Sequence, residues 1–443
     1  MKRIALLYSF ILVSMGLFAQ VLTMEQARTL ALANSRSLAK YNFSLRSSQI
    51  DEKNQFYSML PSPSADYSAS MNYLNRDWVF VNPLDTFNSG LTFSVTQKIF
   101  EGGKSLIQRS INQISTESIR KDALAEYFNV LDSADNAYYA ALEAAATLEA
   151  GEASLQIASL SLSMAEIRQA NGMINQGDYL KALADKESRE NSRNQARRNL
   201  ALNIMKLKML TGIDENFELE QVNFDGYEEL IQFLAAISDE EAEALYGRFW
   251  KILSESNPSL AKASLNTQRS EKNLTIAKRD NVPVVSATIF STALNYSAAN
   301  GFSNSAGGGV TIRGSIPVDF WLTANRIEKS KIARDSSMLD YIGAEISLET
   351  ELQSSLLNVF AQAGSVLSSR RSVEYAERHF EFVMERYRLS QSSVSDVGEA
   401  SSLLITSQNN LIKARYGFLQ SISKLRSLGA IDDEEKLIGI IIN

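Results

Sequence analysis

The sequence predicts an α+β membrane protein in which long antiparallel helical hairpins follow antiparallel strand pairs, with the whole unit used twice. The first observation is the stretch 102–212, which contains no proline and few glycines and repeats apolar residues at helical spacing. The second is a change of the apolar period from about 3.6 to 2 after Pro63. The third is a recurrence of the same features, with Leu38 and Leu260 lying 222 residues apart.

Residues 1–19 are expected to be a signal peptide. Lys2 and Arg3 precede an apolar core that is short for a membrane span, and small residues lie near Ala19. The mature chain is therefore expected to be exported. It has no cysteine, which excludes disulfides and N-terminal lipid attachment. The net charge of −7 disfavours nucleic acid as a partner.

The first structural repeat is expected over residues 20–212. Its opening helix is predicted over 23–58, because Thr23 and Gln26 have the spacing of a capping box. A β-hairpin over 64–97 follows, in which apolar and small polar residues alternate. One apolar, aromatic face and one polar face are typical of a membrane barrel strand. An amphipathic hairpin on a soluble core has the same alternation, so the pattern alone does not decide between the two.

A helical hairpin over 104–211 completes the first repeat. Its first helix is predicted from Lys104 to Ala170, which at ~1.5 Å per residue is on the order of 100 Å long. A globular core has no use for so long a helix. Gly172 and Gly177 predict a sharp turn, after which a second helix returns to Leu210.

The second structural repeat is expected over 256–429. A helix begins at Asn257, a β-hairpin follows over 284–316, and a second helical hairpin is predicted over 324–428. Because the same elements recur in the same order, the two halves are interpreted as an internal repeat.

An acidic equatorial linker, 213–255, is expected between the repeats, beside the long helices. From Met209 to Gly247 there are eleven Asp or Glu residues and no Lys or Arg. A solvated connector is the simplest interpretation of this linker and of the C-terminal tail, 430–443.

Four strands are too few to close a barrel, since even a small one needs about eight, and an open strand edge in lipid leaves backbone groups unpaired. The long helices also carry more apolar surface than one neighbouring helix can cover. The chain is therefore expected to share its barrel with copies of itself, so that two copies give eight strands and three give twelve. The expected result is a β-barrel in an outer membrane, continued by a helical tube into the periplasm.

Several segments resemble the TolC-type family of outer membrane efflux proteins. They are Leu22–Ala27 with Ala31–Ser35, the strand-to-helix junction Gln97–Lys104, its weaker second copy Pro317–Trp321, and Ala414–Tyr416 with Leu428–Gly429. The resemblance implies a homotrimer with a 12-stranded transmembrane β-barrel and a continuous α-barrel. It implies an exit duct in the outer membrane of a tripartite efflux or type I secretion system, with a periplasmic adaptor protein and an inner-membrane pump as partners.

The alternative is a structural coiled-coil protein of the cell envelope without a pore, although such a spacer would not need strand pairs. The transported substrate stays open, because drugs, metal ions and polypeptides use similar ducts. No catalytic triad, metal site or cofactor motif is present, and the single histidine, His379, lies on a helix rich in Glu and Arg. Neither an enzyme nor a cofactor is therefore expected.

The resemblance also implies that the turns of the two helical hairpins are periplasmic tips, where the duct narrows and adaptors dock. The first turn contains Gly172, Ile174 and Gly177, and the second contains Ser390 and Ser392. Ser390 stands where the family has its tip glycine. Ser392 stands where the family has an arginine that links the two turns, so the resemblance implies that this link is absent here.

By position in the same motif, Asp396 and Glu399 match acidic residues that ring the closed aperture. Three copies would place six carboxylates around a narrow axis and attract cations. Tyr387 matches a tyrosine that bonds across to the first turn, at the position of Asp178. The other interpretation is that Asp178 and Asp396 simply cap the return helices. Capping is favoured for Asp178, and the two roles are evenly balanced for Asp396.

Overall fold

The computed structural model describes residues 20–71, 80, 82–298, 300–303, 307–389 and 391–442, so the expected signal peptide lies outside the described residues. The chain divides into two compact units. The helical unit combines the residues up to Ser35 with 127–250 and 352–443, and the strand unit combines 36–126 with 251–351. Each unit therefore takes parts from both sequence repeats rather than one repeat each.

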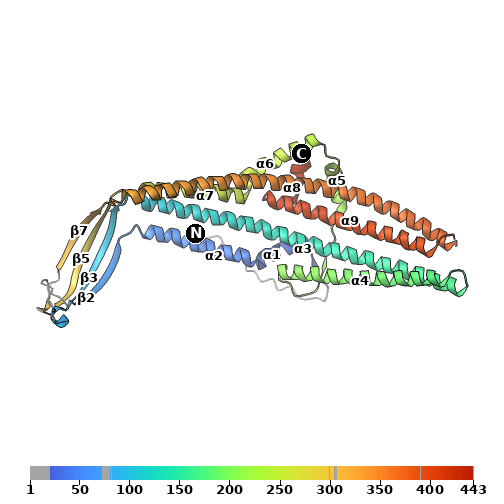
Figure 1. Ribbon diagram of the computed structural model, residues 1–443, viewed down its shortest axis with the longest axis horizontal. Coiled ribbons are helices and arrows are strands. Elements are labelled where there is room, and N and C mark those ends of the chain that lie inside the picture. Colours follow the sequence, from blue (N-terminus) through green and yellow to red (C-terminus); the bar gives the residue numbers. More distant parts are fainter. Residues whose placement is uncertain are drawn as a thin grey trace. The chain divides into compact units, whose positions relative to one another are not determined.

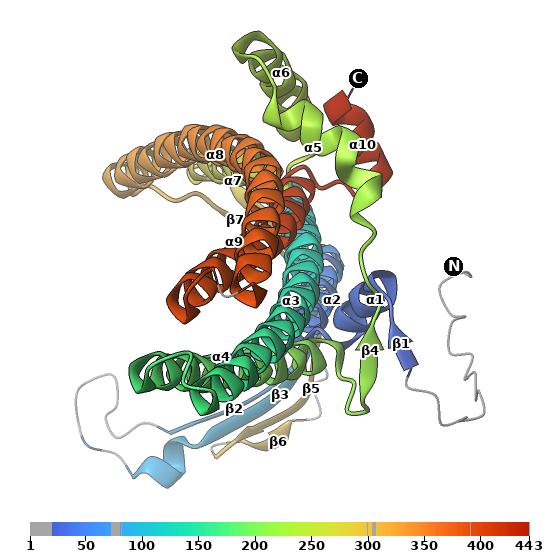
Figure 2. The ribbon, with the colours of Figure 1, turned by 90° about the vertical axis from the view of Figure 1, so that its right-hand side faces the viewer.

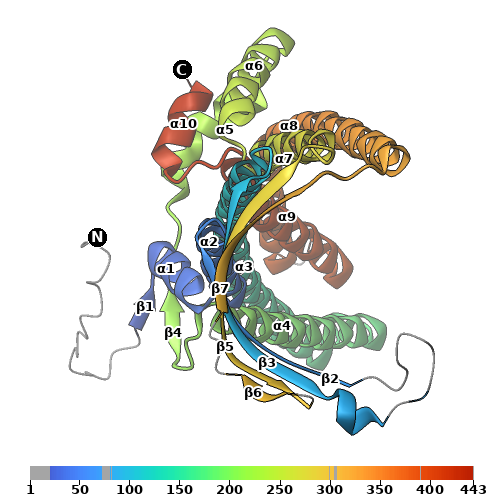
Figure 3. The ribbon, with the colours of Figure 1, turned by 90° about the vertical axis from the view of Figure 1, so that its left-hand side faces the viewer.

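The strand unit contains an antiparallel sheet built from both expected β-hairpins (Figure 3). A 3₁₀ turn, η1, precedes β3. A short strand, β6, pairs in antiparallel fashion with the end of β5. The pairing of β3 with β5 joins the two hairpins into one sheet. The elements are β2 (Ser62–Ser70), η1 (Pro83–Thr86), β3 (Asn88–Phe100), β5 (Val284–Ser297), β6 (Gly301–Ser303) and β7 (Gly307–Ser315), with the order β2-β3-β5-β7 across the sheet.

The strand register gathers the apolar residues on one face of this sheet. Val95 lies opposite Ile289, which in turn lies opposite Val310. This face is open, since Val310 is 67% exposed and Ile312 is 71% exposed. The other face carries hydroxyl groups that bond across strands, such as those of Thr96 and Thr288 at 3.0 Å.

The strand unit also contains α2 (Arg36–Tyr57), α7 (Pro258–Lys278) and the first parts of α3 (Lys104–Ala170) and α8 (Phe320–Arg388). The predicted start of a helix at Asn257 is confirmed, and the structure adds that Asn257 caps α7, its Oδ1 accepting from the amides of Ser259 and Leu260 at 3.0 and 3.1 Å. The predicted start and end of α3 are confirmed.

The prediction of one helix over 23–58 is wrong. The capping box at Thr23 is present, but α1 (Met24–Asn34) ends before Ser35, which is extended with φ −68° and ψ 111°. Beside the break, the Asn34 side-chain Nδ2 donates to the carbonyls of Met209 and Leu210 at 3.2 and 3.1 Å. These carbonyls lie in the last turn of α4 (Gln176–Thr211) and need such donors.

Four long helical segments form the body of the helical unit: the later parts of α3 and α8, with α4 and α9 (Val394–Leu428) (Figures 1 and 2). Their buried residues recur at alternating spacings of three and four, which is the pattern of knobs-into-holes packing between helices. On α8 the stripe is Leu352, Leu356, Val359, Ala363 and Val366. Among the described residues, no helix is both long enough and apolar enough to cross a membrane.

The interpretation of the linker and tail as solvated connectors is wrong. Their short helices are amphipathic and bury apolar side chains, among them Ile231 and Phe249 in the linker and Leu437 in the tail. Strand β1 pairs in parallel with β4, which the sequence did not indicate. The elements are β1 (Gln20–Leu22), β4 (Phe217–Leu219), η2 (Phe224–Tyr227), α5 (Glu228–Ala235), α6 (Asp239–Ser256) and α10 (Glu434–Ile442).

An ion pair fastens the linker to a long helix. The two terminal guanidinium nitrogens of Arg370 on α8, Nη1 and Nη2, each donate to one oxygen of the Glu228 carboxylate at 2.6 Å. Hydrogen bonds from Arg370 and Gln232 lower the pKa of Glu228 to about 2. The acidic linker thus uses part of its charge for docking.

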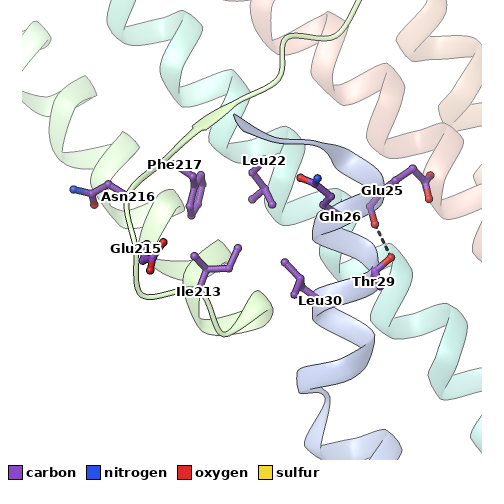
Figure 4. Close-up of a pocket in the computed structure, with 9 residues that line it drawn as sticks. All are labelled: Leu22, Glu25, Gln26, Thr29, Leu30, Ile213, Glu215, Asn216 and Phe217. Carbon is purple, nitrogen blue, oxygen red and sulfur yellow. Dashed lines mark hydrogen bonds between the residues drawn. The ribbon is translucent and has the colours of Figure 1, made fainter. Parts of the chain in front are cut away.

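A pocket of about 530 Å³ lies between α1 and the chain that follows α4 (Figure 4). Leu22, Leu30 and Phe217 supply apolar walls, and Glu25 and Glu215 are at its rim. No site was predicted at this position from the sequence.

A buried charged cluster joins both ends of the chain to the long helices. Asp135 of α3 is 0% exposed and accepts from Arg28 Nε at 2.6 Å, from Arg426 Nη2 at 2.6 Å and from Ser423 Oγ at 2.7 Å. We call this group the Asp135 cluster. It connects α1, α3 and α9, so one carboxylate fixes three helices that are far apart in sequence.

Candidate functional site at the hairpin turns

The first hairpin turn ends α3 in a Schellman motif. The amide of Met173 donates to the Arg168 carbonyl at 2.8 Å, and that of Gly172 donates to the Gln169 carbonyl at 2.9 Å. Gly172 has φ +68°, a conformation that favours glycine. The predicted tip glycine therefore has a clear backbone role. Ile174, after it, packs against buried side chains from both hairpins.

Asn175, and not Asp178, caps the return helix α4. The Asn175 side chain accepts from the Asp178 amide at 2.9 Å, so the prediction that Asp178 is the cap is wrong. Asp178 lies in the first turn, where a negative charge is favourable. Gly177 suits the same cap, because a Cβ there would lie 3.0 Å from Asn175 Oδ1.

The second hairpin turn starts α9 with a capping box. The Ser393 amide donates to Asp396 Oδ2 at 2.8 Å, and the Asp396 amide donates to Ser393 Oγ at 3.1 Å. These bonds from Ser393 hold the pKa of Asp396 below its usual range. Asp396 thus has a capping role while its side chain stays exposed. Ser390 lies outside the described residues, and Ser392 is half-buried.

Glu399 lies one turn beyond Asp396 on α9 and is also exposed. It lines a groove of about 370 Å³ between α4 and α9. Lys181 and Asp185 of α4 line the same groove, so a cationic and a further acidic side chain lie beside Glu399. Sequence reasoning missed Lys181, because spacing along the chain does not say which residues of α4 meet α9.

A shared apolar cluster lies beneath the two turns. It is formed by Ala165, Ala182, Val383, Met384, Tyr387, Val394, Val397 and Ala400, with Ile174 and Phe380 packed against it. All four long helices contribute to this cluster. The helical unit therefore brings both predicted tips together at one end.

Tyr387 is placed differently from the expectation. Its side chain is 0% exposed, and its hydroxyl has no hydrogen-bond partner among the described residues, so the expected bond to Asp178 is not formed. Instead, Arg168 at the end of α3 donates to the Tyr387 carbonyl. The Arg168 guanidinium lies 3.9 Å from the centre of the Tyr387 ring. Arg168 was missed because it lies four residues before the glycine that marks the turn.

The sequence matches the profile of one protein family over 27–213 and 251–429, which is most of the chain. That family is described as outer membrane efflux protein. The chain belongs to this family. Comparison by sequence with curated proteins gives no match.

Solved structures of membrane proteins share the fold of this outer membrane efflux protein. The CmeC outer membrane channel of Campylobacter jejuni has a TM-score of 0.75 at 16% identity, over 94% of this chain and 88% of that chain. The outer membrane protein VceC of Vibrio cholerae has a TM-score of 0.75 at 17% identity, over 93% and 97%. A membrane protein from Pseudomonas aeruginosa gives 0.79 at 14% identity, over 94% and 92%.

The family model makes the chain an outer membrane efflux protein, and a solved outer membrane channel shares its fold. The resemblance drawn from dispersed sequence motifs is thereby confirmed.

Proposed function

We propose that the protein is the outer-membrane exit duct of a tripartite efflux or type I secretion system, assembled as a homotrimer with a 12-stranded β-barrel. In this role it conducts substrate passively from a periplasmic adaptor and an inner-membrane pump to the exterior. The hairpin turns form a gate at the periplasmic end, where Asp396 and Glu399 ring the aperture and the adaptor docks.

The observation that carries the proposal is the open apolar sheet of the strand unit. Among the described residues, β2 pairs only with β3, and β7 pairs only with β5 and so leaves a second free edge. Unpaired edges in lipid are costly, and further copies of the sheet would satisfy them. The exposed apolar face suits contact with lipid, and the hydroxyl-bearing face suits a water-filled lumen.

The first part of α8 supports self-association independently. Ile332, Leu339 and Ile346 recur every seven residues and are 62%, 69% and 57% exposed. A heptad stripe of this kind is suited to packing against another helix. A second copy of the chain is the partner that the proposed tube supplies.

The test of the proposal is single-channel conductance of the detergent-solubilised protein in planar bilayers, with the mass of the oligomer measured alongside. A conducting trimer supports the duct. A water-soluble oligomer without conductance would contradict it and favour a non-pore envelope protein.

Exchanging both Asp396 and Glu399 for alanine is expected to weaken the preference of the channel for cations. The two exposed carboxylates of each chain would be lost from the aperture, and with them their attraction for cations. The reversal potential across a salt gradient measures this preference. An unchanged reversal potential would argue against an acidic ring. The change Glu374→Ala, far from the turn on α8, is the matched control.

Ile312→Arg is expected to destabilise the membrane-inserted protein by about 2–4 kcal/mol, if the open face meets lipid near the middle of the bilayer. The neighbouring change Thr311→Arg is the control, because adjacent strand residues point to opposite faces. It is expected to be tolerated in a watery lumen. Urea unfolding in lipid vesicles measures both, and equal costs would contradict the assignment of the two faces.

A further inference from the structure

The two helical hairpins are linked by polar contacts at two levels of the helical unit. One level is the Asp135 cluster, where Ser423 and Arg426 of α9 bind α3. The other lies toward the turns, where Arg168 binds Tyr387 and where Arg189 Nη2 donates to Ser402 Oγ at 2.6 Å. The first level is buried, whereas Arg168 is half-buried and Ser402 is exposed.

Arg168 stabilises the end of α8 in three ways. The carbonyl of Tyr387 lies in the last turn of α8, where carbonyls have no donor within the helix, and Arg168 supplies one. The guanidinium also covers the face of the Tyr387 ring, in a cation–π contact. Its positive charge stands at the negative end of the α8 dipole.

The Tyr387 hydroxyl lies near Arg168 without forming a hydrogen bond of regular geometry. It is buried with no hydrogen-bond partner among the described residues. Burial raises the pKa of Tyr387, against the opposing charge of Arg168. What Arg168 recognises is therefore the ring and the backbone, which phenylalanine would supply equally well.

We propose that Arg168 is the latch that holds the two hairpin turns together in the closed duct, in place of the expected tyrosine–aspartate link and of the arginine link that Ser392 cannot make. The latch rests on the proposed function, because it needs a gate at these turns. Arg168 is a positioning residue: it fixes the end of α8 against the end of α3. Arg189 reinforces it through Ser402.

The two levels of contact differ in how readily they can be broken. Contacts at a partly exposed site are replaced by bonds to water when they break, whereas a buried ion pair that is broken leaves unpaired buried charges. Opening would therefore break the contacts of Arg168 with Tyr387 and of Arg189 with Ser402, and the turns would separate. The contacts of the Asp135 cluster would stay intact and hold the two hairpins together at that level.

The test is the change Arg168→Gln, measured by conductance in planar bilayers. Losing a cation–π contact and a charged hydrogen bond is expected to shift the closed-to-open equilibrium at least about tenfold toward the open state in each protomer. Arg168→Lys keeps the charge without the planar group and is expected to be intermediate. Tyr387→Phe and Asp178→Asn are expected to behave as wild type. Arg378→Gln is the matched control, because among the described residues Arg378 forms an ion pair with Glu374 on its own helix and none with the other hairpin.

A second measurement does not depend on conduction. The chain has no cysteine, so Val394→Cys places a single thiol in the apolar cluster beneath the turns, where Val394 is 6% exposed. A water-soluble maleimide is expected to label this thiol several-fold faster when Arg168→Gln is also present. This measurement also reports on proteins that have folded but do not form pores.

The outcomes separate the latch from the duct. Faster labelling in Arg168→Gln with no conductance from any variant would support the latch and contradict the proposed function. Conducting channels in which Arg168→Gln matches Arg378→Gln in both measurements would overturn the latch. Opening by Tyr387→Phe would overturn it as well, because the hydroxyl would then be the link.

Discussion

Replacing Asp135 by alanine is expected to lower the free energy of unfolding of the helical unit by about 3–5 kcal/mol. The Asp135 carboxylate is fully buried and is the common acceptor for Arg28 and Arg426. Without it, the buried guanidinium of Arg426 would lose this ion pair, and that of Arg28 would keep only Glu25 and Glu434, which are more exposed than Asp135. Urea unfolding followed by tryptophan fluorescence measures the loss.

Glu25→Gln is the matched control for this prediction. Glu25 also binds Arg28, at 2.5 Å, but its side chain is 80% exposed. An exposed ion pair contributes about 0–1 kcal/mol, so this variant is expected to unfold close to wild type. Similar losses in Asp135→Ala and Glu25→Gln would show that burial is not the source of the effect.

A triple change tests the same reasoning from the opposite side. Asp135→Leu combined with Arg28→Met and Arg426→Met removes all three charges and replaces them with apolar groups. Buried ion pairs exchanged in this way are often neutral in stability or better. The triple variant is therefore expected to recover most of the stability lost by Asp135→Ala.

The Asp135 cluster could not be predicted from the sequence, because its members are far apart along the chain. Arg28 and Asp135 lie 107 residues apart, and Asp135 and Arg426 lie 291 apart. Local spacing predicts which face of a helix is apolar, but it does not say which polar residue of one helix meets which residue of another. Asp135 therefore reads, from the sequence alone, as an ordinary acidic residue in a helix rich in Ser and Ala.

Features with a local physical cause were predicted well. The ends of α3, the capping box at Thr23 and the helix start at Asn257 follow from residues within a few positions of each other. The break at Ser35 was missed; the contact beside it is distant in sequence, since the Asn34 side chain binds carbonyls of α4, 175 residues away. At the turns, Gly172 was singled out from the sequence, whereas the contact of Arg168 with the Tyr387 ring is seen only in the structure.

The change Gly102→Ala is expected to cost about 2–5 kcal/mol in the free energy of unfolding, the sum of two penalties. Gly102 has φ +68°, where a side chain costs about 1–2 kcal/mol. A Cβ at this position would also lie 2.7 Å from Val282 Cγ1, and overpacking of this kind costs about 1–3 kcal/mol. Gly102 joins β3 to α3, and its carbonyl accepts from Arg279 Nη1 at 2.7 Å. A shift of this backbone would disturb the contact between the sheet and the long helix.

Gly172→Ala separates the two penalties. Gly172 has the same φ of +68°, but apart from its chain neighbours no heavy atom of the described residues lies within 4 Å of a Cβ built there. Only the backbone penalty of about 1–2 kcal/mol is expected, so the difference between the two variants isolates the contact with Val282. Val282→Ala added to Gly102→Ala makes room for the new methyl group and is expected to recover part of the loss. If Gly102→Ala and Gly172→Ala unfolded at the same urea concentration, the junction would tolerate a side chain, and close packing against Val282 would not be the reason for glycine at this position.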